Sequence, residues 1–233
     1  MVIMFHGGFA PSFAAERLVA RPFLTAGIDV VALCLPYHMN RAPEDSSYSG
    51  QYLLSGDVPR LVRGFAQAPQ DAVALTLGLR NEGYARVFAG GISLGGNVAA
   101  QLATLVELDF LYMLIPAVDP FETLWNTPIG AGIVRAAHAH GFSDETVEAA
   151  MGLITPRLLG PPKVQPGRMR IVLGRHDLLC PPEPIDALAR AWSAEDIERL
   201  PCGHRSLALH LAGVRRRLVE TARTVPPIRE TVS

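Results

Sequence analysis

The sequence has few cysteines, and their number and spacing argue against two common kinds of stabilised site. Only Cys34, Cys180 and Cys202 occur among the 233 residues. An odd number without a repeated spacing argues against a disulfide framework and against a zinc site. We therefore expect neither a metal site nor a cofactor.

The sequence also lacks a surplus of positive or negative charge. The chain has 21 Lys and Arg against 22 Asp and Glu, which gives a formal net charge of −1. Proteins that bind nucleic acid normally show a basic surplus or a basic stripe. The one notable basic run, at residues 215–217, is typical of the solvated face of a last helix. We expect no nucleic-acid partner.

Long hydrophobic runs are absent, so the sequence predicts no membrane span. The first eight residues lack the basic region that opens a signal peptide, and they instead resemble a strand. We therefore expect a cytoplasmic protein. The length and a hydrophobic content of 49% fit one globular domain with a sizeable core.

Short apolar runs alternate with helical stretches along most of the chain. Continuous apolar strands that alternate with helices indicate a parallel sheet with helices on both faces. The sequence thus predicts an α/β fold with a mostly parallel sheet of about six strands. The expected strands cover residues 2–5, 29–35, 86–89, 110–115, 169–173 and 196–200, and the expected helices begin near residues 12, 57, 97, 183 and 206.

Residues 119–165 break this rhythm. The segment is rich in Pro and Gly, has a helical stretch at about residues 143–154 and has no clear strand. We interpret it as a small helical cap inserted before the strand that begins near residue 169. Residues 1–118 and 166–233 would then form the core domain.

The pentapeptide Gly91-Ile92-Ser93-Leu94-Gly95 is the most informative motif. It follows an apolar run and precedes a helical run, and this strand–turn–helix context is typical of a nucleophile elbow. The flanking glycines allow the close backbone approach that such a turn needs. The motif predicts Ser93 as a nucleophile.

A serine hydroxyl needs a base within hydrogen-bond reach, and the base is usually histidine. Among seven histidines, His204 follows the last expected strand, in a loop at the carboxyl edge of the sheet. Ligands gather at this edge in open α/β folds. We therefore predict His204 as the base.

The base needs an acid to orient it. Asp177 follows the strand at residues 169–173 and lies between Ser93 and His204 in the chain, so it is the predicted acid. Asp119, which follows the preceding strand, is the alternative. The other common use of such aspartates is to cap a turn or a helix.

An attacked carbonyl also needs donors for the negative charge that develops on its oxygen. The backbone N–H of Leu94, which follows the nucleophile, is one predicted donor. The second is expected from the His6-Gly7-Gly8-Phe9 loop, with Gly8 favoured and Phe9 as the alternative. His6 is expected to brace this loop by hydrogen bonding.

Phe9, Tyr37 and Trp125 are the candidates for substrate contact. Tyr37 follows the second expected strand near the mouth of the site and could equally anchor a surface loop. Trp125 lies in the expected cap, where it would either line an apolar acyl pocket or form the core of the cap.

These elements in this order resemble an α/β-hydrolase over nearly the whole chain. The residues that carry the resemblance are His6-Gly7-Gly8, the Ser93 elbow, Asp177 and His204. Within the superfamily, the Pro36-Tyr37-His38-Met39-Asn40-Arg41 segment resembles a little-characterised group with a Pro-Tyr/Pro-His-x-x-Arg segment after the second strand.

The resemblance implies a Ser93–His204–Asp177 triad and a two-step acyl transfer without a cofactor. The expected activity is hydrolysis of a carboxylic ester on a small-molecule acyl substrate. Thioesterase, amidase or acyltransferase activity on the same triad remains open. A non-catalytic binding protein on this fold is a further alternative, since fold does not fix function.

One departure concerns the N-terminus. Relatives of this kind usually have two more antiparallel strands before the His-Gly loop, whereas here that loop's own strand begins at once. If those strands are missing, the first strand is expected at an exposed edge of the sheet, where it would favour a homodimer.

Overall fold

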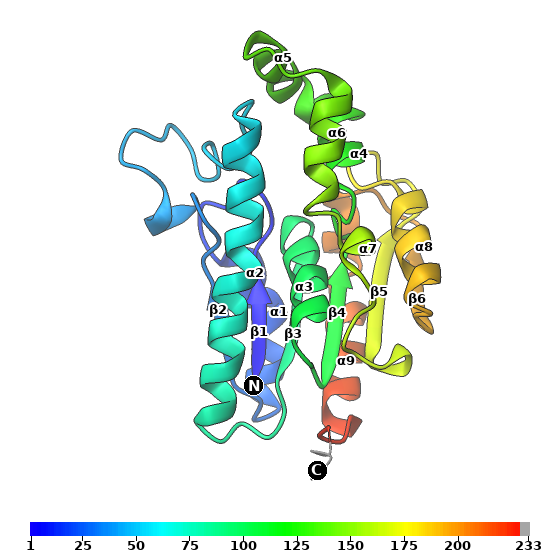
Figure 1. The fold of residues 1–233 in the computed structure, drawn as a ribbon. Coiled ribbons are helices and arrows are strands. Elements are labelled where there is room, and N and C mark those ends of the chain that lie inside the picture. The colour runs from blue at the N-terminus through cyan, green and yellow to red at the C-terminus, as the bar shows by residue number, and fades with distance from the viewer. Residues whose placement is uncertain (229–233) are drawn as a thin grey trace.

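The computed structural model describes residues 1–228. Within these residues, six parallel strands form a single sheet in the order β2-β1-β3-β4-β5-β6. All of the strands therefore end at the same edge of the sheet, which is the upper edge in Figure 1. Their bounds are β1 Val2–Phe5, β2 Val30–Leu33, β3 Phe88–Ile92, β4 Phe110–Leu114, β5 Met169–Gly174 and β6 Asp196–Leu200.

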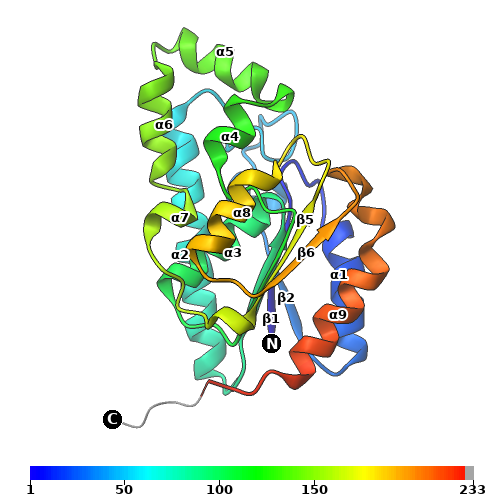
Figure 2. The same ribbon diagram turned by 90° about the vertical axis from the view of Figure 1, so that its right-hand side faces the viewer.

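Helices cover both faces of this sheet (Figure 2). α1 and α9 lie on one face, and α2, α3 and α8 lie on the other. The bounds are α1 Ala14–Thr25, α2 Val58–Asn81, α3 Leu94–Leu105, α8 Pro182–Ala191 and α9 Leu211–Thr224. Short 3₁₀ turns cover η1 Met39–Arg41, η3 Pro166–Arg168 and η4 Arg205–Leu209. The predicted α/β architecture is confirmed.

The alternation of side chains along each strand divides the core into two layers. In β1, Ile3 and Phe5 pack in the larger apolar cluster with α2 and α3, while Val2 and Met4 pack in the smaller cluster with α1 and α9. All four side chains are buried. Strands that are apolar on both faces need helices on both sides, as the sequence predicted.

The long helix α2 begins as its sequence dictates. The Asp57 side chain accepts a hydrogen bond from the Arg60 N–H at 3.0 Å, and Pro59 occupies the first turn, where no intrahelical N–H bond is lost. The helix continues past the buried Pro69 to Asn81.

The expectation of an exposed first strand was wrong. β1 pairs with β2 on one side and with β3 on the other, so it lies in the interior of the sheet. The edges are β2, which is half-buried along its length, and β6. β2 lies on the outer side of β1 and pairs with it in parallel along its length.

The third strand extends further than predicted, through both glycines of the motif to Ile92. Glycine is disfavoured in strands on its own. Here Gly90 is aligned with Met4 of β1 and Tyr112 of β4, and Gly91 with Phe5 and Met113. Pairing on both sides therefore outweighs the local preference and carries the strand up to Ser93.

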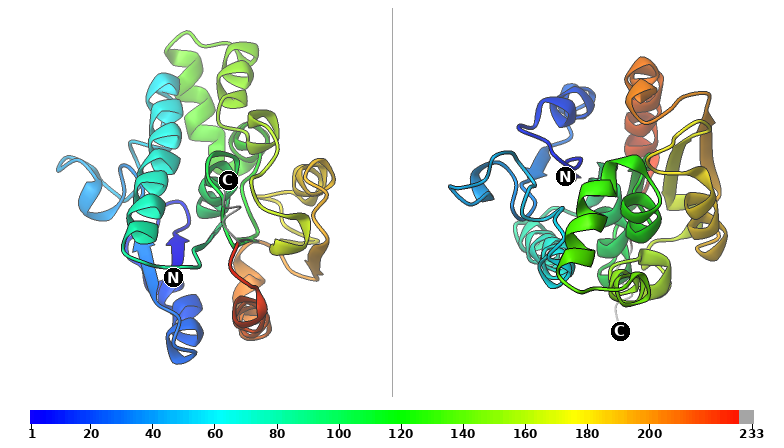
Figure 3. Two further views of the ribbon diagram at one scale, coloured as in Figure 1. Left: turned by 60° about the horizontal axis from the view of Figure 1, so that its bottom comes forward. Right: turned by 90° about the horizontal axis from the view of Figure 1, so that it is seen from above.

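The connection from β4 to β5 is largely helical, and its residues 119–165, which the sequence predicts as a cap, are called the insertion below. It contains α4 Pro120–Trp125, η2 Pro128–Gly130, α5 Ala131–Ala139, α6 Asp144–Gly152 and α7 Pro156–Leu159. From above, these helices lie over the middle of the sheet (Figure 3, right). The insertion thus adjoins the edge at which the strands end.

Candidate active site

Ser93 occupies a tight turn between β3 and α3. Its backbone has φ 55° and ψ −114°, a conformation that costs a non-glycine residue about 1–3 kcal/mol. Two contacts with the end of β4 hold the turn: the Ser93 N–H donates to Leu114 O at 2.9 Å, and Ser93 O accepts from the Ala117 N–H at 3.0 Å. The surrounding structure therefore holds the strain in place.

The two glycines of the motif allow β3 and α3 to approach each other. A Cβ on Gly91 would overlap the backbone of Gly95, and a Cβ on Gly95 would overlap the carbonyl oxygen of Phe5 at the end of β1. Only glycine fits at both positions, which gives the motif its physical basis in this chain.

His204 lies in the loop after β6 and meets the serine. Its Nε2 is 3.1 Å from Ser93 Oγ, and its Nδ1 is 2.8 Å from Asp177 Oδ2. The Gly203 N–H donates to Ser206 Oγ at 2.9 Å within the same loop. The structure thus brings together three predicted residues that are as far as 111 positions apart in the chain.

Asp177 is fully buried below this loop. Its second oxygen, Oδ1, accepts hydrogen bonds from the N–H groups of Leu179 and Cys180, both at 2.9 Å. These donors orient the carboxylate so that Oδ2 faces the imidazole. The alternative acid, Asp119, instead caps α4 by accepting from the Glu122 N–H at 3.1 Å.

The predicted oxyanion donors flank Ser93. Leu94 is the first residue of α3, and the first N–H groups of a helix have no partner within it. Gly8 and Phe9 line the same cavity as Ser93, and Phe9 has a φ of 59°. The positive end of the α3 dipole also points at this place, which favours negative charge there.

His6 braces the loop of residues 6–9, which follows β1. The Leu35 N–H donates to His6 Nε2 at 3.0 Å, so Nδ1 carries the proton and donates to Gly7 O at 2.8 Å. Burial lowers the pKa of His6 to about 4, which keeps the ring neutral. Both ring nitrogens are engaged, so His6 is a brace and not a free base.

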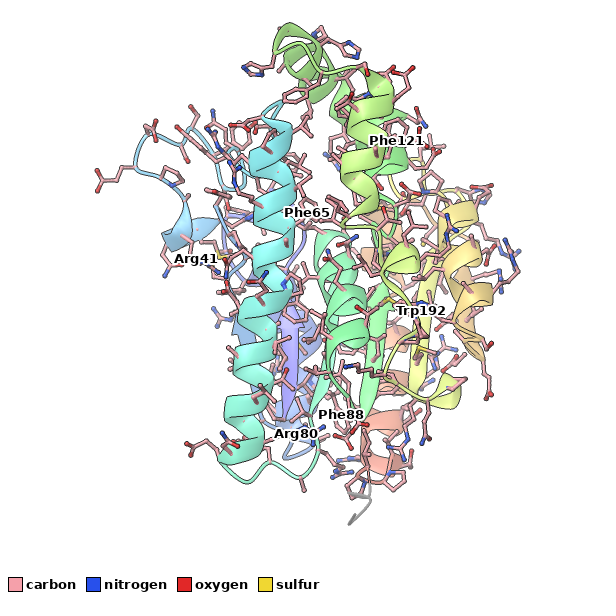
Figure 4. All side chains as sticks on the ribbon, in the orientation of Figure 1. Arg41, Phe65, Arg80, Phe88, Phe121 and Trp192 are labelled. Atoms are coloured by element: carbon pink, nitrogen blue, oxygen red, sulfur yellow. The ribbon has the colours of Figure 1, made fainter. Side chains whose placement is uncertain are left out.

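A cavity of about 700 Å³ opens onto Ser93 and His204. Its walls are largely apolar, and they come from segments far apart in the sequence. Phe65, on α2, lies on the side of the helix that faces α3 (Figure 4). The larger apolar side chains of the lining are Phe9, Leu54, Phe65, Leu94, Leu124, Ile129, Leu178 and Leu179.

Two of the three predicted substrate contacts lie outside the cavity lining. Trp125 stacks on Phe121, with ring centroids 5.8 Å apart, and donates to Asp144 Oδ1 at 2.7 Å. It therefore packs inside the helical insertion. Tyr37 stacks on Tyr52 at 6.3 Å and anchors the loop after β2.

The rest of the Pro36–Arg41 segment is also anchored to the body of the protein. His38 is fully buried and donates from Nδ1 to Pro36 O at 2.9 Å. Arg41 donates to Cys34 O at 2.9 Å and pairs with Asp71 at 2.7 Å. These contacts fix the loop after β2, and the segment's resemblance to a narrower group of hydrolases stays a prediction.

Sequence reasoning missed the cavity residues on the insertion and on the loop after β5. Thr123, Thr127 and Leu179 are among them, and nothing in their local pattern separates them from ordinary helix or loop residues. Cys180 also lies beside the nucleophile. Burial, together with the charge of Asp177, raises the pKa of this thiol to about 12.

Two properties concern the described chain as a whole. Nowhere within residues 1–228 do three His, Cys, Asp or Glu side chains converge in a way that would hold a metal ion. None of the helices in this range has the length and apolar character needed to cross a membrane.

The sheet order, the elbow after the third strand and the loops that follow the fifth and sixth strands together define the α/β-hydrolase fold, and comparisons with solved structures support this. Est1E from Butyrivibrio proteoclasticus with bound ferulic acid has a TM-score of 0.64 at 15% identity, covering 96% of this chain and 89% of that one. An acetyl xylan esterase from Paenibacillus sp. R4 has a TM-score of 0.63 at 16% identity, covering 94% of this chain and 73% of that one.

The alignment with a hydrolase of the α/β superfamily from Xanthomonas campestris pv. campestris covers both chains almost completely. Its TM-score is 0.54 at 19% identity, with 96% of this chain and 98% of that one aligned. No family model and no curated protein matches the sequence. At these identities the likeness concerns the fold, and this chain has the α/β-hydrolase fold.

Proposed function

We propose that the protein is a serine hydrolase that cleaves carboxylic esters through an acyl-enzyme. The observation that carries the proposal is the continuous set of contacts from Ser93 Oγ through His204 to the buried Asp177. An alcohol, a base and an orienting acid in this arrangement are the requirements for nucleophilic catalysis by serine.

In the first step, Ser93 Oγ attacks the ester carbon and His204 Nε2 takes the hydroxyl proton. The tetrahedral oxyanion is stabilised by the N–H groups of Leu94 and Gly8 or Phe9. His204 then gives its proton to the leaving oxygen as the ester C–O bond breaks. An alcohol departs, and the acyl group stays on Ser93.

In the second step, water replaces the alcohol. His204 takes a proton from the water, the resulting hydroxide attacks the acyl carbon, and the Ser93 Oγ–carbon bond breaks as the proton returns to Oγ. Asp177 stays ionised and stabilises the imidazolium at both stages. The helical insertion would act as a lid that shields the acyl group from bulk water.

The names of structurally similar proteins agree with an ester substrate. They include an acetyl xylan esterase, a monoacylglycerol lipase from Paleococcus ferrophilus and a thermophilic esterase from Thermogutta terrifontis. The apolar cavity would suit the acyl group of such an ester.

Covalent labelling with a fluorophosphonate probe and turnover of short-chain p-nitrophenyl esters test the proposal. Ser93→Ala should abolish labelling and lower kcat by about 10⁴-fold or more. Ser143→Ala, which removes an exposed serine that caps α6, should leave both unchanged. Labelling or turnover that persists in Ser93→Ala would refute the proposed nucleophile.

A further inference from the structure

The two sides of the cavity at Ser93 differ in character. The side nearer to β1 is apolar, with Leu54 from the loop before α2 and Phe65 from α2 itself. A Cβ added to Gly8 would lie 3.3 Å from Leu54 Cδ1, which places Leu54 directly beside the loop that follows β1. Leu124 and Ile129 of the insertion add further apolar wall.

The side nearer to β5 and β6 carries the polar lining residues His176 and Arg205 beside Leu178 and Leu179, so this side is mixed in character. His176 and Arg205 come from two loops that are bonded to each other, since the His176 N–H donates to Cys202 O at 3.0 Å. Both side chains are exposed to solvent. Within residues 1–228, Arg205 lines the cavity but makes no ion pair and no side-chain hydrogen bond, so its five donors have no protein partner.

No carboxylate lines this cavity in the part of the chain that the structure describes. The nearby charge of Asp177 is buried, and its oxygens are engaged by His204 and by two backbone N–H groups. A negative group at the opening would therefore meet the Arg205 guanidinium without an adjacent lining acid to compete for it.

The reaction chemistry places one part of the substrate on this side. His204 Nε2 must give its proton to the leaving oxygen, so that oxygen lies next to the imidazole in the first step. Arg205 directly follows His204, and His176 directly precedes Asp177. The atoms attached to the leaving oxygen therefore extend past Arg205 and His176, while the acyl group lies against the apolar side.

We propose that the preferred substrates are esters of an apolar acyl group with an alcohol that carries an anionic group, either a carboxylate or a phosphate. This inference rests on the proposed ester hydrolysis at Ser93. Arg205 is the residue that binds the anion, and its planar set of donors suits both groups. The cleavage step itself is unchanged: the leaving alkoxide takes its proton from His204 and departs with its anionic group.

The test uses hexanoyl esters of three phenols that differ in charge at a distance from the reacting oxygen. These are 4-hydroxyphenylacetate, its neutral amide and 4-hydroxybenzylphosphonate. The wild type should have a kcat/KM about two- to fivefold higher for either anion than for the amide, a range typical of one solvent-exposed ion pair. The ratio between the two anions then shows which group the site prefers.

Three variants assign the preference to Arg205. Arg205→Gln should reduce the ratio of anion to amide to about one, and Arg205→Lys should retain part of it. Arg190→Gln, which removes an exposed arginine on α8 outside the cavity lining, should leave the ratio intact. Raising the ionic strength should lower the ratio in the wild type, because the pair is partly exposed. This measurement on the wild type does not depend on whether any variant folds.

Equal turnover of the three esters by the wild type would overturn the inference, and so would a ratio that is unchanged in Arg205→Gln. If the amide ester is cleaved in a Ser93-dependent way without any preference for the anions, only the anion site is wrong. If none of the esters is cleaved in a Ser93-dependent way, the proposed ester hydrolysis itself fails.

Discussion

His204 Nδ1 lies 2.8 Å from Asp177 Oδ2. The other oxygen of the same carboxylate, Oδ1, accepts hydrogen bonds from the N–H groups of Leu179 and Cys180. The carboxylate therefore cannot rotate without breaking its two hydrogen bonds to backbone N–H groups. Because it accepts the Nδ1 proton, it selects the imidazole tautomer in which Nε2 has a free lone pair towards Ser93.

Asp177→Asn tests this relationship. The amide would donate to His204 Nδ1 and thereby favour the tautomer with the proton on Nε2, which cannot accept the proton of Ser93. We expect kcat for a p-nitrophenyl ester to fall by about 10³–10⁴-fold. Asp119→Asn is the matched control, since asparagine also caps helices well and activity should change little. The reverse pattern would move the acid to Asp119.

The close contact between the elbow and β1 predicts that one added methyl group strongly lowers the stability of the protein. Gly95→Ala would place a Cβ against the carbonyl oxygen of Phe5, and we expect it to lower the free energy of unfolding by about 3 kcal/mol or more. Gly78→Ala, at an open and exposed position of α2, should raise it by about 0.5–1 kcal/mol. Urea denaturation measures both; a stable Gly95→Ala would contradict the close packing.

The neutral, buried His6 predicts a loss of stability in mild acid. Its pKa is about 4 in the folded protein and 6.5 when exposed, so the unfolded chain binds the additional proton as the pH falls from 6.5 towards 4. The free energy of unfolding should decrease over this range by up to about 3 kcal/mol from this group.

Denaturation midpoints of the wild type and of His6→Asn at several pH values in this range measure the effect. Burial also lowers the pKa of His38, whose ring centroid lies 4.7 Å from that of His6. His38 adds to the slope in both proteins, so the difference between them reports on His6. Equal slopes would mean that His6 is not the group responsible.

The apolar wall beside the oxyanion loop predicts a limit on the size of the acyl group. Leu54→Trp should fill part of the cavity of about 700 Å³ and lower kcat/KM for an octanoyl ester by about tenfold more than for an acetyl ester. Trp125→Phe, inside the insertion and outside the lining, should not change this chain-length profile. A profile that shifts in Trp125→Phe but not in Leu54→Trp would place the acyl group elsewhere.

The sequence predicts the sheet and the residues around Ser93 well, because both follow from local patterns. Buried parallel strands appear as continuous apolar runs, and the Gly91–Gly95 motif reflects a steric requirement of a single turn. His204 and Asp177 follow from the rule that loops at the carboxyl ends of strands meet at one edge.

Other features depend on long-range packing and leave no local signal. The interior place of β1 is set by the crossover to β2, which no single segment encodes. Trp125 and Tyr37 belong to segments that the sequence places near the opening. In the structure, each ring stacks on a neighbouring aromatic ring and lies outside the cavity lining. The lining from Thr123 to Ile129 depends on how the insertion folds over the sheet.

The position of β6 at the edge of the sheet has a consequence for how the protein fails under stress. Within the described residues 1–228, β6 pairs only with β5, and the loop that follows it carries His204. Detachment of this one strand would separate the base from Ser93 while the central strands stay paired, and such sub-global opening costs less free energy than complete unfolding. Catalysis should therefore disappear at lower urea concentrations than the helical circular-dichroism signal, so that activity reports on the attachment of a single edge strand.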